Sequence, residues 1–66
     1  MYGSERRRHI AEVLQASGRV TVADLASGLD VSPETIRRDL SLLETEGVLE
    51  RTHGGAVPAV PGGRVE

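Results

Sequence analysis

The stretch VSPETIRRDL, residues 31–40, carries the local signals of a helix start. Ser32 is a preferred N-cap residue, and Pro33 follows at the first helical position, where its missing N–H is not needed. Two adjacent arginines, Arg37 and Arg38, then fall near the beginning of the helix, where the helix dipole disfavours positive charge by a few tenths of a kcal/mol to about 1 kcal/mol. A phosphate or a guanine base would more than offset that penalty.

The apolar residues of this helix define its inward face. With about 100° per residue, Ile36, Leu40 and Leu43 form one stripe that we expect to face the core. The opposite side carries Glu34, Arg38, Ser41 and Thr45. Thr35 and Arg37 fall on the flanks of the helix. The sequence therefore predicts a polar, arginine-bearing outer face on a helix that ends near Gly47.

Cap residues and apolar spacing predict three helices, at residues 4–17, 22–28 and 33–46. Ser4 is the expected N-cap of the first helix, and Thr21 is the expected N-cap of the second. A tight connection at Asp30 and Val31 joins the second helix to the third, which is the arrangement of a helix-turn-helix. The residues expected in the core are Leu14, Leu25, Ile36, Leu40 and Leu43.

Two short strand-like segments follow the third helix. VLERT (48–52) and AVPAV (56–60) flank the turn sequence HGG (53–55), which predicts a β-hairpin. RVTV (19–22) is a short strand that could pair with the hairpin and close a three-stranded sheet. The predicted fold is mainly α, a small α+β winged helix-turn-helix. We expect residues 1–57 to form this domain and residues 58–66, rich in proline and glycine, to be a linker or disordered tail.

Composition sets limits on function. The 66 residues are enough for one domain, and the net charge of −2 means that any surface for nucleic acid must be local. With two histidines and no cysteine, we expect no metal site and no cofactor. No apolar run approaches the roughly 20 residues of a membrane span, so no membrane partner is expected. No nucleophile motif, carboxylate pair or phosphate loop predicts an enzyme.

The spacing of VSPETIRRDL and of RTHGGA (51–56), together with Arg6, Ile10 and Leu14, resembles the DeoR family of bacterial transcription regulators. The resemblance covers roughly Ser4 to Val57. It implies a DNA-binding module, usually of a repressor of sugar or nucleoside catabolism. The absence of cysteine fits a reducing cytoplasm, where we expect the protein to act. It also implies a C-terminal effector domain for a phosphorylated sugar-like metabolite, which would be absent from this chain. We expect the isolated module to be a monomer and the intact protein a homo-oligomer.

In a helix-turn-helix the second helix of the motif enters the major groove of double-stranded DNA, and here that helix is residues 33–46. Arg38 faces outward and is the expected reader of a base edge, while Arg37 is the expected phosphate contact. We expect the hairpin wing to lie on the backbone or in the minor groove of the operator. The predicted DNA-binding residues are Ser32, Glu34, Thr35, Arg37, Arg38, Ser41, Arg51, His53 and Gly54.

Other charged residues have a structural alternative. Asp39 falls beside the core stripe, where an ion pair or hydrogen bond suits it better than a DNA contact. Arg6, Arg7 and Arg8 are either solvated or, for one or more of them, in contact with phosphate. The alternative function is a winged-helix module for protein–protein interaction without DNA binding, which the acidic total would suit. Such a surface would be expected to expose apolar or aromatic side chains on the third helix, and this helix exposes polar ones.

Overall fold

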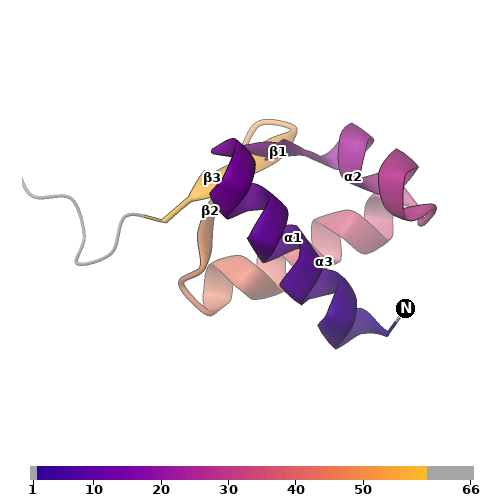
Figure 1. Ribbon diagram of the computed structural model, residues 1–66, viewed down its shortest axis with the longest axis horizontal. Helices are drawn as coiled ribbons and strands as arrows, with labels where there is room; N and C mark the ends of the chain where they lie inside the picture. Colours follow the sequence, from indigo (N-terminus) through magenta and orange to yellow (C-terminus); the bar gives the residue numbers. More distant parts are fainter. Residues whose placement is uncertain (1, 60–66) are drawn as a thin grey trace, which may run out of the picture.

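The computed structural model describes residues 2–59, which fold into three helices and a three-stranded antiparallel sheet (Figure 1). The chain order is α1 (Gly3–Ser17), β1 (Val20–Thr21), α2 (Val22–Leu29), α3 (Pro33–Thr45), β2 (Leu49–Thr52) and β3 (Gly55–Pro58). The strands lie in the order β1-β3-β2, so β3 is the central strand and pairs with both β1 and β2. This arrangement confirms the predicted winged helix-turn-helix.

The helix boundaries follow the predicted caps, with one exception. Thr21 caps α2 by accepting a hydrogen bond of 3.0 Å from the Asp24 N–H. The prediction that Ser4 caps α1 is wrong, because the helix begins at Gly3 and Tyr2 is the N-cap residue. The Glu5 carboxylate accepts from the Tyr2 N–H at 3.2 Å, which satisfies a helix-start donor without a serine cap.

The core lies between the three helices and the sheet. All five residues expected there are buried, and Ile36 and Leu40 are completely inaccessible to solvent. The other buried apolar side chains are Ile10, Val20, Val22, Ala26, Leu49 and Ala56. None of the helices among residues 2–59 has the length and hydropathy needed to cross a membrane.

The end of α3 turns the chain back along the same helix. Gly47 has a φ of 82°, in the left-handed region that glycine adopts without a steric penalty. The Val48 N–H donates to the Leu43 carbonyl and the Gly47 N–H donates to the Glu44 carbonyl, each at 3.0 Å. This is the Schellman pattern, and it directs β2 to pack against α3.

The two glycines of the hairpin have different roles. Gly54 forms the turn with His53 and has a φ of 82°. Gly55 already belongs to β3, and a Cβ added to it would lie 2.0 Å from the carbonyl oxygen of Val20. The Val22 N–H also donates to the Gly54 carbonyl at 2.8 Å. The pairing of β1 with the hairpin confirms the prediction for RVTV, and the hydrogen bond to Val22 also attaches the turn to the start of α2.

The hairpin extends slightly past the expected domain boundary at residue 57. Pro58 lies in β3 opposite Leu49, and the Ala59 N–H donates to the Val48 carbonyl at 3.3 Å. The rest of the expected linker, residues 60–66, lies outside the described part of the chain.

Candidate nucleic-acid interface

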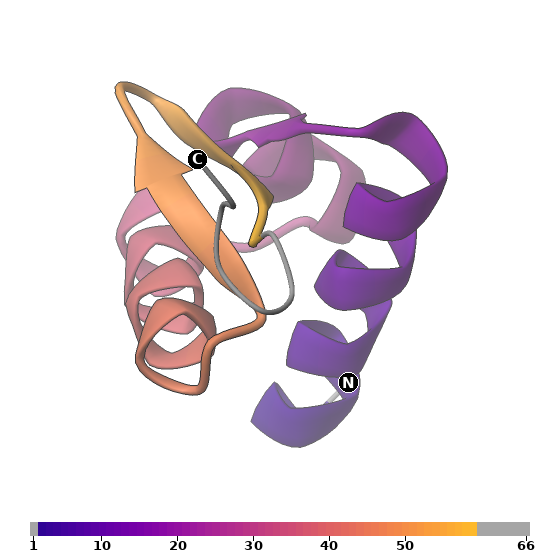
Figure 2. The same cartoon turned by 90° about the vertical axis from the view of Figure 1, so that its left-hand side faces the viewer.

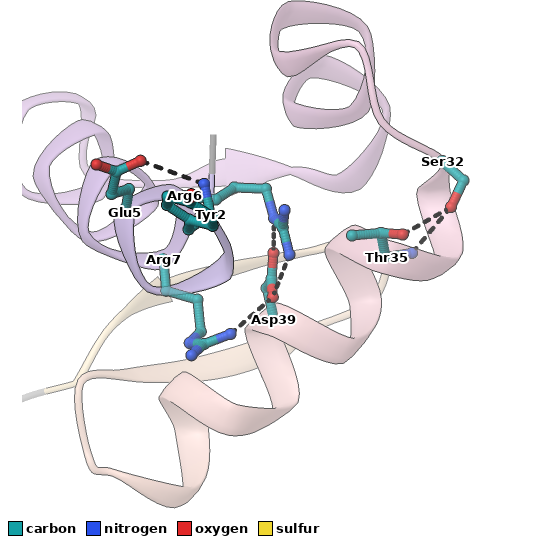
Figure 3. Close-up of polar contacts among 7 residues, drawn as sticks. All are labelled: Tyr2, Glu5, Arg6, Arg7, Ser32, Thr35 and Asp39. Carbon is teal, nitrogen blue, oxygen red and sulfur yellow. Dashed lines mark hydrogen bonds and ion pairs between the residues drawn. The ribbon is translucent and has the colours of Figure 1, made fainter.

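The beginning of α3 is fixed by its own side chains. Ser32 Oγ accepts a hydrogen bond of 3.1 Å from the Thr35 N–H, and the two hydroxyl groups lie 3.0 Å apart (Figure 3). Pro33 occupies the first turn, as predicted. Both capping hydroxyls therefore lie at the same end of the helix as the two arginines.

The outer face of α3 is polar and exposed. Glu34, Arg37, Arg38 and Ser41 are all exposed to solvent. Within residues 2–59, neither Arg37 nor Arg38 has a carboxylate partner within ion-pair distance, and the i, i+4 pair of Arg38 with Glu34 is not formed. Both guanidinium charges are therefore free to meet an anion from outside.

A second pair of adjacent arginines, at the start of α1, is paired with a buried carboxylate. Arg6 donates from Nε and from Nη2 to the two carboxylate oxygens of Asp39, and the Nη2 bond measures 3.2 Å. Arg7 Nη1 donates to Oδ1 of the same carboxylate at 3.3 Å (Figure 3). The Asp39 side chain is only 2% exposed. The hydrogen bond to Asp39 raises the pKa of the Arg6 guanidinium, although desolvation opposes the shift.

This cluster confirms the structural role expected for Asp39. It also holds Arg6 and Arg7 within the fold, although one carboxylate balances only one of their two positive charges. Arg8, the third member of the run, is exposed. The cluster joins the first turns of α1 to the middle of α3, so it helps to set the position of the outer face of α3.

The hairpin residues are divided between two locations. His53 and Gly54 are exposed at the turn, as a wing contact would require. Arg51, which was expected to reach only the DNA flanking the groove, instead lies against α3. Its Nη1 donates to Ser41 Oγ at 2.9 Å, and its backbone N–H donates to Glu44 Oε2 at 3.0 Å.

The position of Arg51 has a simple cause in the sequence. Alternate residues of a strand point to the same face of a sheet, so Arg51 shares a side with the buried Leu49. The side chains of Glu50 and Thr52 are exposed. This alternation was present in LERT and would have placed Arg51 beside α3. Leu49 therefore predicts the orientation of Arg51 better than proximity to the turn does.

Arg19 is a candidate that the sequence reasoning missed. It is exposed directly before β1, and it lines a hollow of about 460 Å³ together with His53 and Thr21. The signal available was the predicted pairing of RVTV with the hairpin, which brings residue 19 close to the wing. Figure 2 shows α3 and the hairpin on one side of the molecule and α1 on the other. The two elements that carry the predicted DNA-binding residues thus lie on a common side of the molecule.

Comparison with known proteins agrees with this geometry. Residues 6–59 match the DeoR-like helix-turn-helix domain. The chain belongs to this family. The DeoR-like domain accounts for α2, α3 and the hairpin, and most of α1.

The chain is 47% identical over 64 residues to the HTH-type transcriptional regulator GlpR of Haloferax volcanii, covering 97% of the chain and 25% of that relative. It is 43% identical over 56 residues to the lactose phosphotransferase system repressor of Lactococcus lactis, covering 85% of the chain and 22% of the relative. It is 50% identical over 48 residues to the L-fucose operon activator of Haemophilus influenzae, covering 73% and 19%. The DeoR-like chain thus spans about a quarter of such relatives or less. No solved structure matches it.

Proposed function

We propose that this chain is the module of a transcriptional regulator that binds double-stranded DNA at a specific sequence. The observation that carries the proposal is the contrast in charge on α3. Asp39 on one flank forms ion pairs with Arg6 and Arg7, whereas Arg37 and Arg38 are exposed without a carboxylate partner among the described residues. An acidic chain with a net charge of −2 needs such a local cationic surface to approach DNA.

The proposed docking follows from the geometry of helix-turn-helix proteins. The outer face of α3 enters the major groove, and its N-terminal half reaches base edges. Arg38 faces the bases, where arginine recognises guanine through O6 and N7. Ser32 and Thr35 lie at the helix start, next to phosphate, and Arg37 contacts the backbone from the flank. His53 and Gly54 at the wing turn approach the backbone or the minor groove.

For an intact regulator that carries this module, the names of the relatives support control of carbohydrate genes. One is called a lactose phosphotransferase system repressor and another an L-fucose operon activator. We propose repression of genes for sugar or related catabolism, in the cytoplasm. In such an intact regulator, segments other than residues 1–66 would bind a phosphorylated sugar-like effector and form the contacts of a homo-oligomer. The DNA-binding module has no enzymatic role in this scheme.

Titration with duplex DNA, followed by NMR chemical shifts of the backbone amides, tests the proposal. Non-specific contacts to phosphate typically give a dissociation constant of about 10⁻⁴ to 10⁻⁶ M at physiological salt, and affinity falls steeply as salt rises. A single module without a partner half-site should bind in that range. The shifts should concentrate on residues 32–41 and 51–55 and should diminish on addition of salt.

The alternative is a winged-helix module for protein–protein interaction. It becomes the better interpretation if duplex DNA at low salt shifts neither residues 32–41 nor residues 51–55. A useful control is the exposed part of α1 on the opposite side of the molecule, such as Glu12, whose amide should not respond.

A further inference from the structure

Arg51 belongs to strand β2 of the wing, and its side chain contacts the outer face of α3. Its guanidinium group reaches Ser41 Oγ at 2.9 Å from strand β2. Ser41 lies three residues after Arg38 on the same exposed side of α3. The tip of Arg51 therefore lies next to the surface that would enter the groove, about one helical turn beyond Arg38.

The guanidinium of Arg51 is incompletely satisfied. Arginine has five N–H donors, and Ser41 is the one acceptor that the described residues provide to this side chain. Nε is buried and has no hydrogen-bond partner. Nη2 makes no hydrogen bond to another residue within residues 2–59. A donor group with this much unused capacity has room for acceptors from a ligand.

The charge of Arg51 is also not cancelled by an ion pair within the described residues. The Glu44 carboxylate of α3 accepts from the Arg51 backbone N–H at 3.0 Å and forms no ion pair with its guanidinium. Glu50, on the same strand, has its side chain exposed. The hydrogen bond to Ser41 has a charged donor, so it is stronger than one between neutral groups and holds the guanidinium in place. Nη2 can therefore donate to a DNA acceptor while Nη1 stays hydrogen-bonded to Ser41.

We propose that Arg51 is a specificity-determining residue that acts together with Ser41. The guanidinium donates to the acceptor edge of a guanine in the major groove, at a base pair adjacent to the Arg38 contact, while Ser41 directs it there. This inference rests on the proposed DNA-binding function and extends it. It replaces the expectation from the sequence that Arg51 contacts only the flanking backbone or minor groove.

Selection of bound sequences from a random duplex library tests the proposal. The wild-type chain, Arg51→Ala, Ser41→Ala and Arg38→Ala are each used at low salt, and base preferences are compared position by position. Arg51→Ala and Ser41→Ala should relax the preference at the same base pair, and Arg38→Ala at a different one. Removing one good side-chain interaction with a base corresponds to roughly 5- to 150-fold in discrimination.

Arg51→Lys separates base reading from charge. Lysine keeps the positive charge but not the planar fork that matches guanine. This variant should keep the salt dependence of the wild type and still lose the preference. Circular dichroism and amide spectra confirm that each variant is folded.

Three results would overturn the proposal. If Arg51→Ala weakens selected and scrambled duplexes by the same factor, Arg51 contacts phosphate only. If Arg51→Ala and Ser41→Ala relax different positions, the two residues do not act together. In both cases the wild-type chain still enriches a sequence, so the proposed function survives. If the wild-type chain binds no duplex, the proposed function and this inference fail together.

Discussion

Two pairs of adjacent arginines occur near the starts of two helices, and only one of the two pairs forms ion pairs within the described residues. Arg6 and Arg7 in α1 point at a buried carboxylate, and their side chains are 15% and 28% exposed. Arg37 and Arg38 in α3 are exposed and meet no carboxylate within the described residues. The two dipeptides are the same, so the difference comes from what lies opposite each pair.

The residue that separates the two cases is Asp39, which directly follows Arg38 in the chain. Consecutive residues on a helix point about 100° apart, so Asp39 faces α1 while Arg38 faces away from it. One short segment, RRD, thus supplies two unpaired cations and the anion that forms ion pairs with two others. A run of charge can be assigned to binding or to structure only when the facing element is known.

The largest expected effect on stability comes from removing both arginines that pair with Asp39, Arg6 and Arg7. In Arg6→Met/Arg7→Met, Asp39 stays buried without a partner, and breaking a buried ion pair in this way typically costs about 3–5 kcal/mol. A chain of 66 residues has a total stability of only about 3–10 kcal/mol at typical values per residue. Urea denaturation followed by circular dichroism should show a domain that is largely or wholly unfolded.

Two matched variants show whether the unpaired charge is the cause. Arg8→Met removes an exposed arginine of the same run, and it should change the stability by no more than about 0.5 kcal/mol. Adding Asp39→Leu to the double variant should recover much of the stability, because well-packed apolar groups can replace a buried ion pair. An unchanged urea midpoint in the double variant would show that the cluster has no structural role.

The next effect concerns the core side of α3, immediately after Asp39. Leu40 is 0% exposed, and Leu40→Ala should lower the free energy of unfolding by about 2–5 kcal/mol, as large-to-small core changes generally do. Leu42 is 43% exposed and provides the control, since Leu42→Ala should have a much smaller effect. Thermal melting of both variants makes the comparison. Equal melting temperatures for the two would mean that the inward face of α3 has been assigned wrongly.

Most of the fold was predictable because its signals are local. Ser32, Pro33 and Gly47 mark the ends of α3 through preferences that act within one turn, and the apolar stripe sets its inward face. The local signal at Ser4 predicted the wrong N-cap for α1. The Glu5 carboxylate satisfies the helix-start donor at Tyr2, so α1 begins one residue earlier.

The less predictable part of the site depends on contacts between distant segments. Arg6 and its partner Asp39 are 33 residues apart, so the sequence could suggest an ion pair for Asp39 but not name its partner. The role of Gly55 depends on the approach of Val20 from β1. Arg51 is an intermediate case, since strand alternation after Leu49 predicts its direction, although the hydrogen bond to Ser41 needs the packing of β2 on α3.

A moderate effect on DNA binding is expected when the exposed pair, Arg37 and Arg38, loses its outward-facing arginine. Arg38→Ala should weaken binding to the preferred sequence by about 1–3 kcal/mol and relax the preference at one base pair. Its stability should stay within about 0.5 kcal/mol of the wild type, because the side chain is exposed. Titration of fluorescent duplexes, one with the selected sequence and one scrambled, measures both affinities. If both fall by the same factor, Arg38 contacts the backbone and not a base.

The smallest effect separates Arg37 from Arg38 within the free pair. Arg37 lies on the flank of α3 and is expected to meet a phosphate, so Arg37→Ala should weaken selected and scrambled duplexes about equally. Removing one arginine–phosphate interaction should flatten the plot of log affinity against log salt by about one unit. Arg8→Ala is the control, because Arg8 is an exposed arginine of α1 and belongs neither to α3 nor to the hairpin. An equal change in slope for both variants would mean that α1 also touches the DNA backbone. An unchanged slope for Arg37→Ala would restrict the function of the free pair to Arg38 alone.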